Sequence, residues 1–189
     1  MHITLIAGSN RHHAISTSIL RYIENLLKSN NIPVSFIDLA AVQLPLFSPD
    51  SEVVPKEAEP LITSVEQADG IILGTPEYHG SISGTLKNAL DYLDNRHVAG
   101  KPFLTVSSAG GPLGVSSLLH LQSIIRNLHG IHCPEWISVG EGQSIFDPNG
   151  LPQDKEILGR IDQAVEQFIA LVKKLGHDSK HSEKVMMET

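Results

Sequence analysis

The chain has 189 residues, of which 41% are hydrophobic and 19% are charged, a composition typical of a globular domain. It has 21 acidic and 14 basic residues, a net charge of −7 and no basic stripe, which argues against nucleic acid as a partner. The chain has one cysteine, which cannot form an internal disulfide. Its N-terminal apolar run is too short for a signal peptide, and no run reaches the ~20 apolar residues that span a bilayer. We therefore expect a cytoplasmic protein with no membrane partner.

Short apolar runs that favour strands alternate along the chain with segments of helical periodicity. The runs predicted to be strands are residues 2–7, 34–38, 70–73, 102–107 and 135–139. Apolar stripes typical of helices lie at residues 19–27, 61–68, 86–93, 118–128 and 157–172. Several strand runs are almost continuously apolar, as expected for strands covered on both faces, and the alternation predicts a parallel sheet built from right-handed βαβ units.

Two segments fall outside this alternation. Residues 40–60 contain four prolines and are expected to form an irregular connection. Residues 177–189 are polar and aperiodic, which predicts a flexible C-terminal tail after a single domain of residues 1–176.

Ligands of open parallel sheets bind at the carboxyl ends of the strands, where the strand order reverses. Three loops with unusual composition leave the first, third and fourth predicted strands, at residues 8–18, 75–84 and 107–115. We therefore expect these loops to form one site.

The first loop carries hydroxyls and a guanidinium just before a predicted helix. Its candidate phosphate ligands are Ser9, Arg11, Ser16, Thr17 and Ser18. Arginine can bind two phosphate oxygens, and the free N–H groups of a helix N-terminus add donors. The loop matches neither G-x-G-x-x-G nor G-x-x-x-x-G-K-[ST], which favours a monophosphate. The alternative is a cluster of ordinary helix-capping residues.

The second loop combines turn-forming glycine and proline with Tyr78 and His79, whose flat side chains could lie along a planar heterocycle. Glu77 could either orient its own turn or contact a ligand directly. The third loop, residues 107–114, is rich in serine and glycine.

Together these loops resemble the signature of the NAD(P)H-dependent FMN reductase family, which includes azoreductase- and quinone reductase-type members. The resemblance rests on the Gly-Ser-x-Arg loop at residue 8, the run P-E-Y-H-G-S-x-x-G-x-L-K-N-A-x-D from residue 76, and the S-x-G-G-x-x-G turn from residue 108. It covers about residues 3–139. One departure is His79, where many relatives carry asparagine.

The resemblance implies a flavodoxin-like α/β fold, a three-layer sandwich around a five-stranded parallel sheet of order 2-1-3-4-5. It also implies bound FMN, with the phosphate on the first loop. Residues expected to flank the flavin ring are Pro76, Glu77, Tyr78, His79, Ser107, Ser108, Gly110, Gly111 and Gly114. Members of the family generally form homodimers or homotetramers.

The expected activity is an FMN-dependent NAD(P)H oxidoreductase, in which hydride passes from NAD(P)H to FMN and on to a small-molecule acceptor such as a flavin, a quinone or an azo compound. The alternative is a non-enzymatic, flavodoxin-like electron carrier. No side chain is assigned as a catalytic acid or base, and no metal site is expected. Cys133 is interpreted as a packing residue and Trp136 as a packing or interface residue. Asp91 and Asp94 are interpreted as part of a solvated helix face.

Overall fold

The computed structural model describes residues 1–140, 146–147 and 153–187, with side chains described up to residue 176. Five strands of this part of the chain form one parallel sheet of order β2-β1-β3-β4-β5, which confirms the predicted order. The strands are β1 (Ile3–Ala7), β2 (Val34–Asp38), β3 (Gly70–Pro76), β4 (Pro102–Ser108) and β5 (Ile131–Val139).

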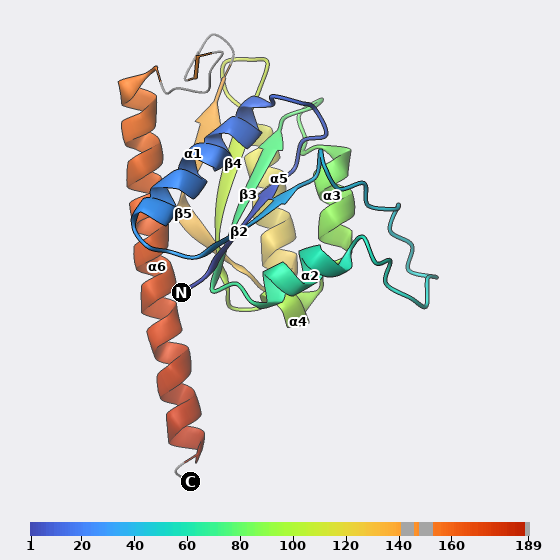
Figure 1. The fold of residues 1–189 in the computed structure, drawn as a ribbon, viewed down its shortest axis with the longest axis vertical. Coiled ribbons are helices and arrows are strands. Elements are labelled where there is room, and N and C mark those ends of the chain that lie inside the picture. The colour runs from blue at the N-terminus through green and yellow to red at the C-terminus, as the bar shows by residue number, and fades with distance from the viewer. Residues whose placement is uncertain (141–145, 148–152, 188–189) are drawn as a thin grey trace.

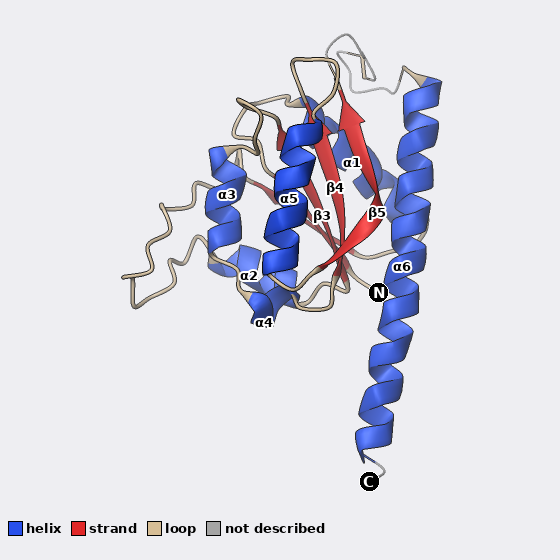
Figure 2. Cartoon of the chain, turned by 180° about the vertical axis from the view of Figure 1, so that it is seen from behind, coloured by secondary structure: helices blue, strands red, loops and turns tan. Residues whose placement is uncertain are grey.

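Helices cover both faces of the sheet and complete a three-layer sandwich (Figures 1 and 2). One face packs against α1 (Ile15–Ser29) and α6 (Lys155–Met187). The other face packs against α2 (Glu59–Glu66), α3 (Gly84–Asp91), α4 (Asn95–Val98) and α5 (Val115–Asn127). The connection between β2 and α2, predicted to be irregular, extends away from the sheet in Figure 1.

The two cores take alternate residues of the same strands. Ile3 and Leu5 of β1 pack on the α1 and α6 side, whereas Ile6 packs on the side of α2, α3 and α5. Ile72 and Leu73 of β3 divide between the cores in the same way. Each fully buried aliphatic side chain contributes about 1.5–3 kcal/mol, so a strand that faces two cores must be apolar at every position.

Strand β5 begins at Ile131, four residues before the predicted start at residue 135. The register against β4 shifts between Phe103 and Thr105, at the point where Pro134 lies in β5. Proline lacks an N–H donor, and this edge strand accommodates it at the irregularity. The buried Cys133, 1% exposed, lies in the same segment and packs in the core, as expected.

Two helices also differ from the sequence-based expectation. Helix α4 has only four residues, capped by Asp94, and is too short to show an apolar period. Helix α6 extends to Met187 and so includes most of the segment expected to be a flexible tail. The domain boundary at residue 176 and the mobility of the tail stay predictions.

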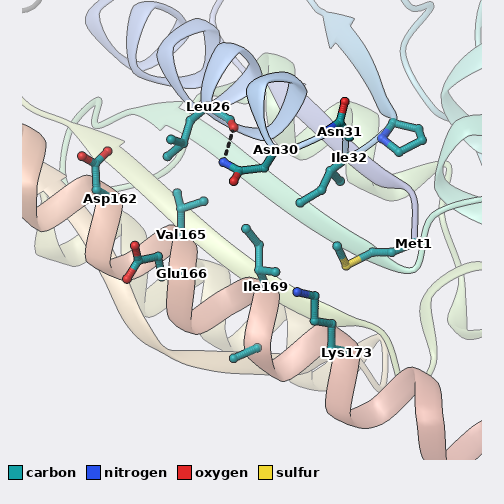
Figure 3. Close-up of a pocket in the computed structure, with 12 residues that line it drawn as sticks. Met1, Leu26, Asn30, Asn31, Ile32, Asp162, Val165, Glu166, Ile169 and Lys173 are labelled. Carbon is teal, nitrogen blue, oxygen red and sulfur yellow. Dashed lines mark hydrogen bonds between the residues drawn. The ribbon is translucent and has the colours of Figure 1, made fainter.

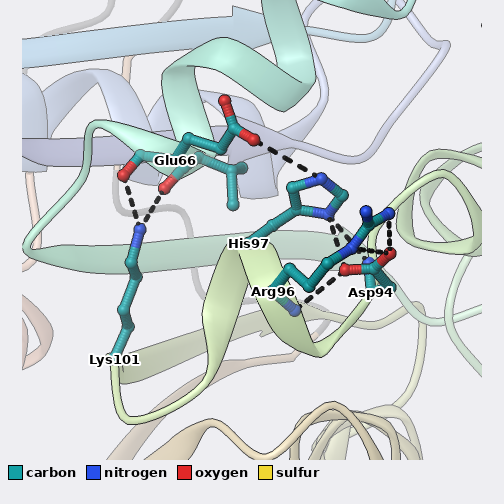
Figure 4. A network of polar contacts seen from close by, with 6 residues as sticks. Glu66, Asp94, Arg96, His97 and Lys101 are labelled. Carbon is teal, nitrogen blue, oxygen red and sulfur yellow. Dashed lines mark hydrogen bonds and ion pairs between the residues drawn. The ribbon is translucent and has the colours of Figure 1, made fainter.

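A polar network ties α2 to α4 beside the amino ends of β3 and β4 (Figure 4). The Nζ atom of Lys101 donates hydrogen bonds of 2.7 Å to the carbonyls of Val65 and Glu66 at the end of α2. Burial lowers the pKa of Lys101. The ring of His97 lies between the carboxylates of Glu66 and Asp94. A cation at a helix C-terminus is stabilising, which gives this network a structural role.

The predicted solvated helix face is confirmed at Asp91, which forms an exposed ion pair with Lys87 at 2.7 Å.

A groove of about 750 Å³ lies at the amino edge of the sheet, between the end of α1 and the middle of α6 (Figure 3). Its lining includes Leu26, Ile32 and Ile169. Among the described residues, no helix is long and apolar enough to cross a membrane.

Candidate functional site

The sequence-predicted loops meet at the carboxyl edge of the sheet. Strand β1 pairs with β2 on one side and with β3 on the other, so the strand order reverses beside β1. This arrangement is the topological switch point at which open α/β sheets bind ligands. The register pairs Ala7 with Gly74 and Pro76 with Ser108, and the three loops follow these strand ends directly.

The first loop ends in a helix N-terminus that has no side-chain cap. The N-cap residue of α1 is Ala14, which makes no capping hydrogen bond, and the first turn holds no acidic residue. Ser16, which is 1% exposed, is the one described residue whose buried side-chain polar atom lacks a hydrogen-bond partner. The hydroxyls therefore do not cap the helix, and an orphan buried hydroxyl beside free helix N–H groups suits an anionic ligand.

Ser9 and Arg11 lie in the loop that precedes this helix N-terminus. The Ser9 hydroxyl is buried and accepts a hydrogen bond of 3.1 Å from the backbone N–H of Arg11, while the Arg11 side chain is exposed. Thr17 and Ser18 are partly exposed in the first turn of α1. The residues present therefore fit a phosphate group, with hydroxyls, backbone donors and one guanidinium in one loop.

The start of the first loop packs tightly against β3 and α3. The backbone N–H of Gly8 donates to the carbonyl of Gly74 at 2.7 Å. Ser83 donates its hydroxyl hydrogen to the carbonyl of Gly8 and accepts from the backbone N–H of Leu86 at 3.0 Å. Ser83 is thus both the N-cap of α3 and the link between the first two loops. Sequence reasoning missed it, although serine before a helix is a recognisable capping signal.

The second loop is a tight hairpin turn. Tyr78 and Ser81 exchange two backbone hydrogen bonds of 2.9 and 3.0 Å. The two residues between them, His79 and Gly80, have φ angles of 52° and 73°. Positive φ at both central positions defines a type I′ turn, which favours asparagine followed by glycine. The turn exposes the side chain of Tyr78, 45% accessible, beside the strand ends.

The backbone of this turn explains the departure from the family pattern at position 79. Asparagine and histidine are both enriched at positive φ, whereas β-branched residues are not. We expect His79→Asn to leave the free energy of unfolding almost unchanged and His79→Val to lower it by about 1–2 kcal/mol. Urea unfolding of both variants checks this. An equal loss in both would show that the histidine ring, and not the backbone angle, stabilises the turn.

Hydrogen bonds of buried serine hydroxyls hold the third loop in place. Ser107 and Ser117 share a hydrogen bond of 2.7 Å between their buried hydroxyls, and Ser117 also donates to the carbonyl of Gly114 at 3.0 Å. The Gly114 N–H donates to the hydroxyl of Ser138 at 2.8 Å. The Ser107 hydroxyl is therefore directed at α5, while Gly110 is exposed on the loop.

Glu77 connects the second loop to the third. Its backbone N–H donates to the carbonyl of Ser108 at 2.7 Å, and its carboxylate accepts from the backbone N–H of Ser117 at 2.8 Å. These contacts support the expectation that Glu77 orients its own turn, because its carboxylate joins the turn to α5. Direct contact between Glu77 and a ligand stays a prediction.

The structure brings all the sequence-predicted site residues to one edge of the sheet, and their contacts with FMN stay predictions. Residues that sequence reasoning missed are mostly buried serines and threonines that join the loops: Thr75, Ser83, Ser117 and Ser138. No local pattern marks Ser117 or Ser138, because Glu77, which binds Ser117, and Gly114, which binds Ser138, are distant in the sequence. In the part of the chain that the structure describes, no group of three histidine, cysteine or acidic residues is arranged to hold a metal ion.

Known proteins resemble this chain in sequence and in fold. The family described as NADPH-dependent FMN reductase matches residues 1–144. An FMN-dependent NADPH-azoreductase of Staphylococcus aureus (strain USA300) is 31% identical over 175 residues, which cover 89% of this chain and 93% of that protein.

Solved structures show the same fold at lower sequence identity. A flavoenzyme NAD(P)H:(acceptor) oxidoreductase, FerB from Paracoccus denitrificans, aligns with a TM-score of 0.77 at 19% identity and covers 92% of this chain and 97% of that one. A flavodoxin from the domain Archaea aligns with a TM-score of 0.63 at 14% identity, covering 94% of this chain and 100% of that one. The flavodoxin-like fold is therefore confirmed, and the family match over residues 1–144 shows that this chain belongs to the NADPH-dependent FMN reductase family.

Proposed function

We propose that this protein is an FMN-dependent NAD(P)H oxidoreductase that delivers electrons to a small-molecule acceptor such as a flavin, a quinone or an azo compound. The observation that carries the proposal is the buried, unpartnered hydroxyl of Ser16 at the uncapped N-terminus of α1, placed at the switch point of the sheet. Membership of the NADPH-dependent FMN reductase family supports the choice of ligand.

In this proposal the FMN phosphate is bound by Ser9, Arg11, Ser16, Thr17 and Ser18. Buried hydroxyls and helix N–H groups supply hydrogen bonds, and the exposed guanidinium of Arg11 supplies the balancing charge. The flavin ring is flanked by the turn from Pro76 to His79 on one side. On the other side lie the residues of the third loop, Ser107, Ser108, Gly110, Gly111 and Gly114.

The chemistry that FMN supplies when bound is acceptance of hydride from NAD(P)H and donation of electrons to a second substrate. The protein contributes placement and electrostatics. Backbone N–H groups of the second and third loops would stabilise negative charge on the ring edge, because fixed donors need no reorganisation. The exposed Tyr78 would form one wall of the space in which the nicotinamide and the acceptor bind in turn.

The test is NAD(P)H oxidation by the purified, FMN-loaded protein. We expect turnover when NADPH or NADH is supplied with a quinone or an azo dye, followed at 340 nm and at the dye's absorbance. Failure of both nicotinamides in protein that binds FMN would contradict the enzyme proposal and favour the electron carrier. A protein that does not take up FMN would contradict both.

We further propose that the protein assembles as a homodimer or homotetramer and resides in the cytoplasm. Exposed apolar side chains on the β2–α2 connection support assembly, since Leu46 is 86% and Val53 is 75% exposed. The connection is held against α3 by Asn88, which donates to the Pro45 carbonyl and accepts from the Phe47 N–H, each at 2.8 Å. Light scattering of the purified protein should give the mass of a dimer or tetramer, and Leu46→Asp should weaken this assembly. A monomeric mass for the unchanged protein would contradict the assembly. Cell fractionation tests the cytoplasmic location.

A further inference from the structure

Helix α5 lacks a cap of its own and obtains one from the second loop. Its N-cap residue is Gly114, which has no side chain to accept a hydrogen bond. The third N–H of the helix, from Ser117, donates instead to the Glu77 carboxylate at 2.8 Å, across 40 residues of sequence. A carboxylate at a helix N-terminus satisfies an otherwise unpaired donor and interacts favourably with the helix dipole.

A second side chain of α5 holds the other end of the same turn. The Nδ1 atom of His120 lies 2.9 Å from the hydroxyl of Ser81, where they form a hydrogen bond. Ser117 and His120 are three residues apart and therefore lie on the same face of the helix. Between these two contacts, Gly80 approaches α5 closely enough for an added Cβ atom to lie 4.0 Å from the Cβ atom of Ser116.

The segment between the two contacts is stiff. Tyr78 and Ser81 close the type I′ turn with two backbone hydrogen bonds, so the turn moves as one unit. Its position is consequently set where it meets other elements, namely at Glu77, at Ser81 and at the 2.7 Å bond from the Glu77 N–H to the Ser108 carbonyl.

We propose that Glu77 and His120 are positioning residues that fasten the turn of residues 76–81 to α5. They hold the backbone amides of this turn and of the third loop in one arrangement toward the flavin ring. The proposal deepens the proposed function and rests on FMN binding at this edge. It assigns to Glu77 an indirect role, through Ser117, and it adds His120, which no sequence motif marked.

The test compares Glu77→Ala and His120→Ala with the conservative variants Glu77→Gln and His120→Asn. Glutamine keeps an oxygen that can accept from the Ser117 N–H, and asparagine keeps a polar atom toward Ser81. FMN titration followed by flavin fluorescence should show binding weakened about fivefold in each alanine variant, the effect of one lost hydrogen bond of about 1 kcal/mol. At saturating FMN, the visible circular dichroism and the midpoint potential of the flavin should also change, and the conservative variants should restore both.

Glu156→Ala is the matched control, because Glu156 is an exposed carboxylate in the first turn of α6. Unchanged affinity, dichroism and potential in Glu77→Ala and His120→Ala would overturn the proposal, as would equal effects in Glu156→Ala. Loss in Glu77→Gln as large as in Glu77→Ala would also overturn it, because the negative charge and not the hydrogen bond would then matter. His120 is exposed, so its variants remain informative if Glu77→Ala fails to fold.

A measurement without FMN separates this proposal from the proposed function. In the FMN-free protein, the amides of Tyr78, Ser81 and Ser117 should exchange with solvent about fivefold faster in Glu77→Ala than in the parent protein. Faster exchange in a chain that fails to bind FMN would contradict the proposed function and leave the fastening of the turn intact. Unchanged exchange would contradict the fastening whatever the enzyme activity.

Discussion

Arg11→Ala is expected to weaken FMN binding by about ten- to a hundredfold, because a charge-assisted hydrogen bond contributes about 1.5–3 kcal/mol. The Arg11 guanidinium is exposed, so its removal should leave the free energy of unfolding of the FMN-free protein unchanged. Fluorescence titration with FMN gives the affinity, and urea unfolding gives the stability. Arg126→Ala, which removes an exposed arginine in the last turn of α5, is the matched control.

Ser16→Ala sharpens this test of the phosphate site. The Ser16 hydroxyl is buried and lacks a hydrogen-bond partner, so its removal should not lower the stability of the FMN-free protein. FMN binding should nevertheless weaken about ten- to a hundredfold, because a hydrogen bond to a charged group contributes about 1.5–3 kcal/mol. A loss of stability without a loss of affinity would contradict the assignment of Ser16, and an unchanged affinity in Arg11→Ala would contradict that of the loop.

Gly8→Ala is expected to lower the free energy of unfolding by about 1–3 kcal/mol and to abolish tight FMN binding. A Cβ atom at this position would lie 2.7 Å from the carbonyl oxygen of Gly74 and 2.7 Å from the Cβ atom of Leu86. The Gly74 oxygen belongs to the backbone of β3, and the Leu86 Cβ atom is bonded directly to the backbone of α3, so neither atom can rotate away. The first loop would have to move from the strand that positions it, and the phosphate donors would move with it.

Gly159→Ala, in α6 and outside the FMN site, is the matched control for this effect, because a Cβ atom at Gly159 would have no heavy atom within 4 Å. Urea unfolding and FMN titration of the two variants provide the comparison. Equal stability of both proteins would show that the first loop tolerates displacement from β3, contrary to the close packing seen here.

Much of this architecture could be predicted from the sequence. Strand runs such as that of β1 are apolar at consecutive positions because both faces of the sheet are covered, and this pattern predicted a parallel α/β fold. The three loops were recognisable because glycines, hydroxyls and Arg11 occur together directly after strands. Errors were local: β5 starts earlier because a register shift accommodates Pro134, and α4 is too short for any period to appear.

Hydrophobic periodicity and short motifs are properties of neighbouring residues, so the parallel α/β fold and the three loops could be predicted from the chain alone, while the strand order and the FMN ligand were implied by the family resemblance. The way in which the loops are joined is visible only in the folded structure. Glu77 caps a helix 40 residues away, Ser83 binds the carbonyl of Gly8, and Ser16 is left without a partner. These facts depend on contacts between distant segments, and such contacts exist only once the sheet has brought its strand ends together.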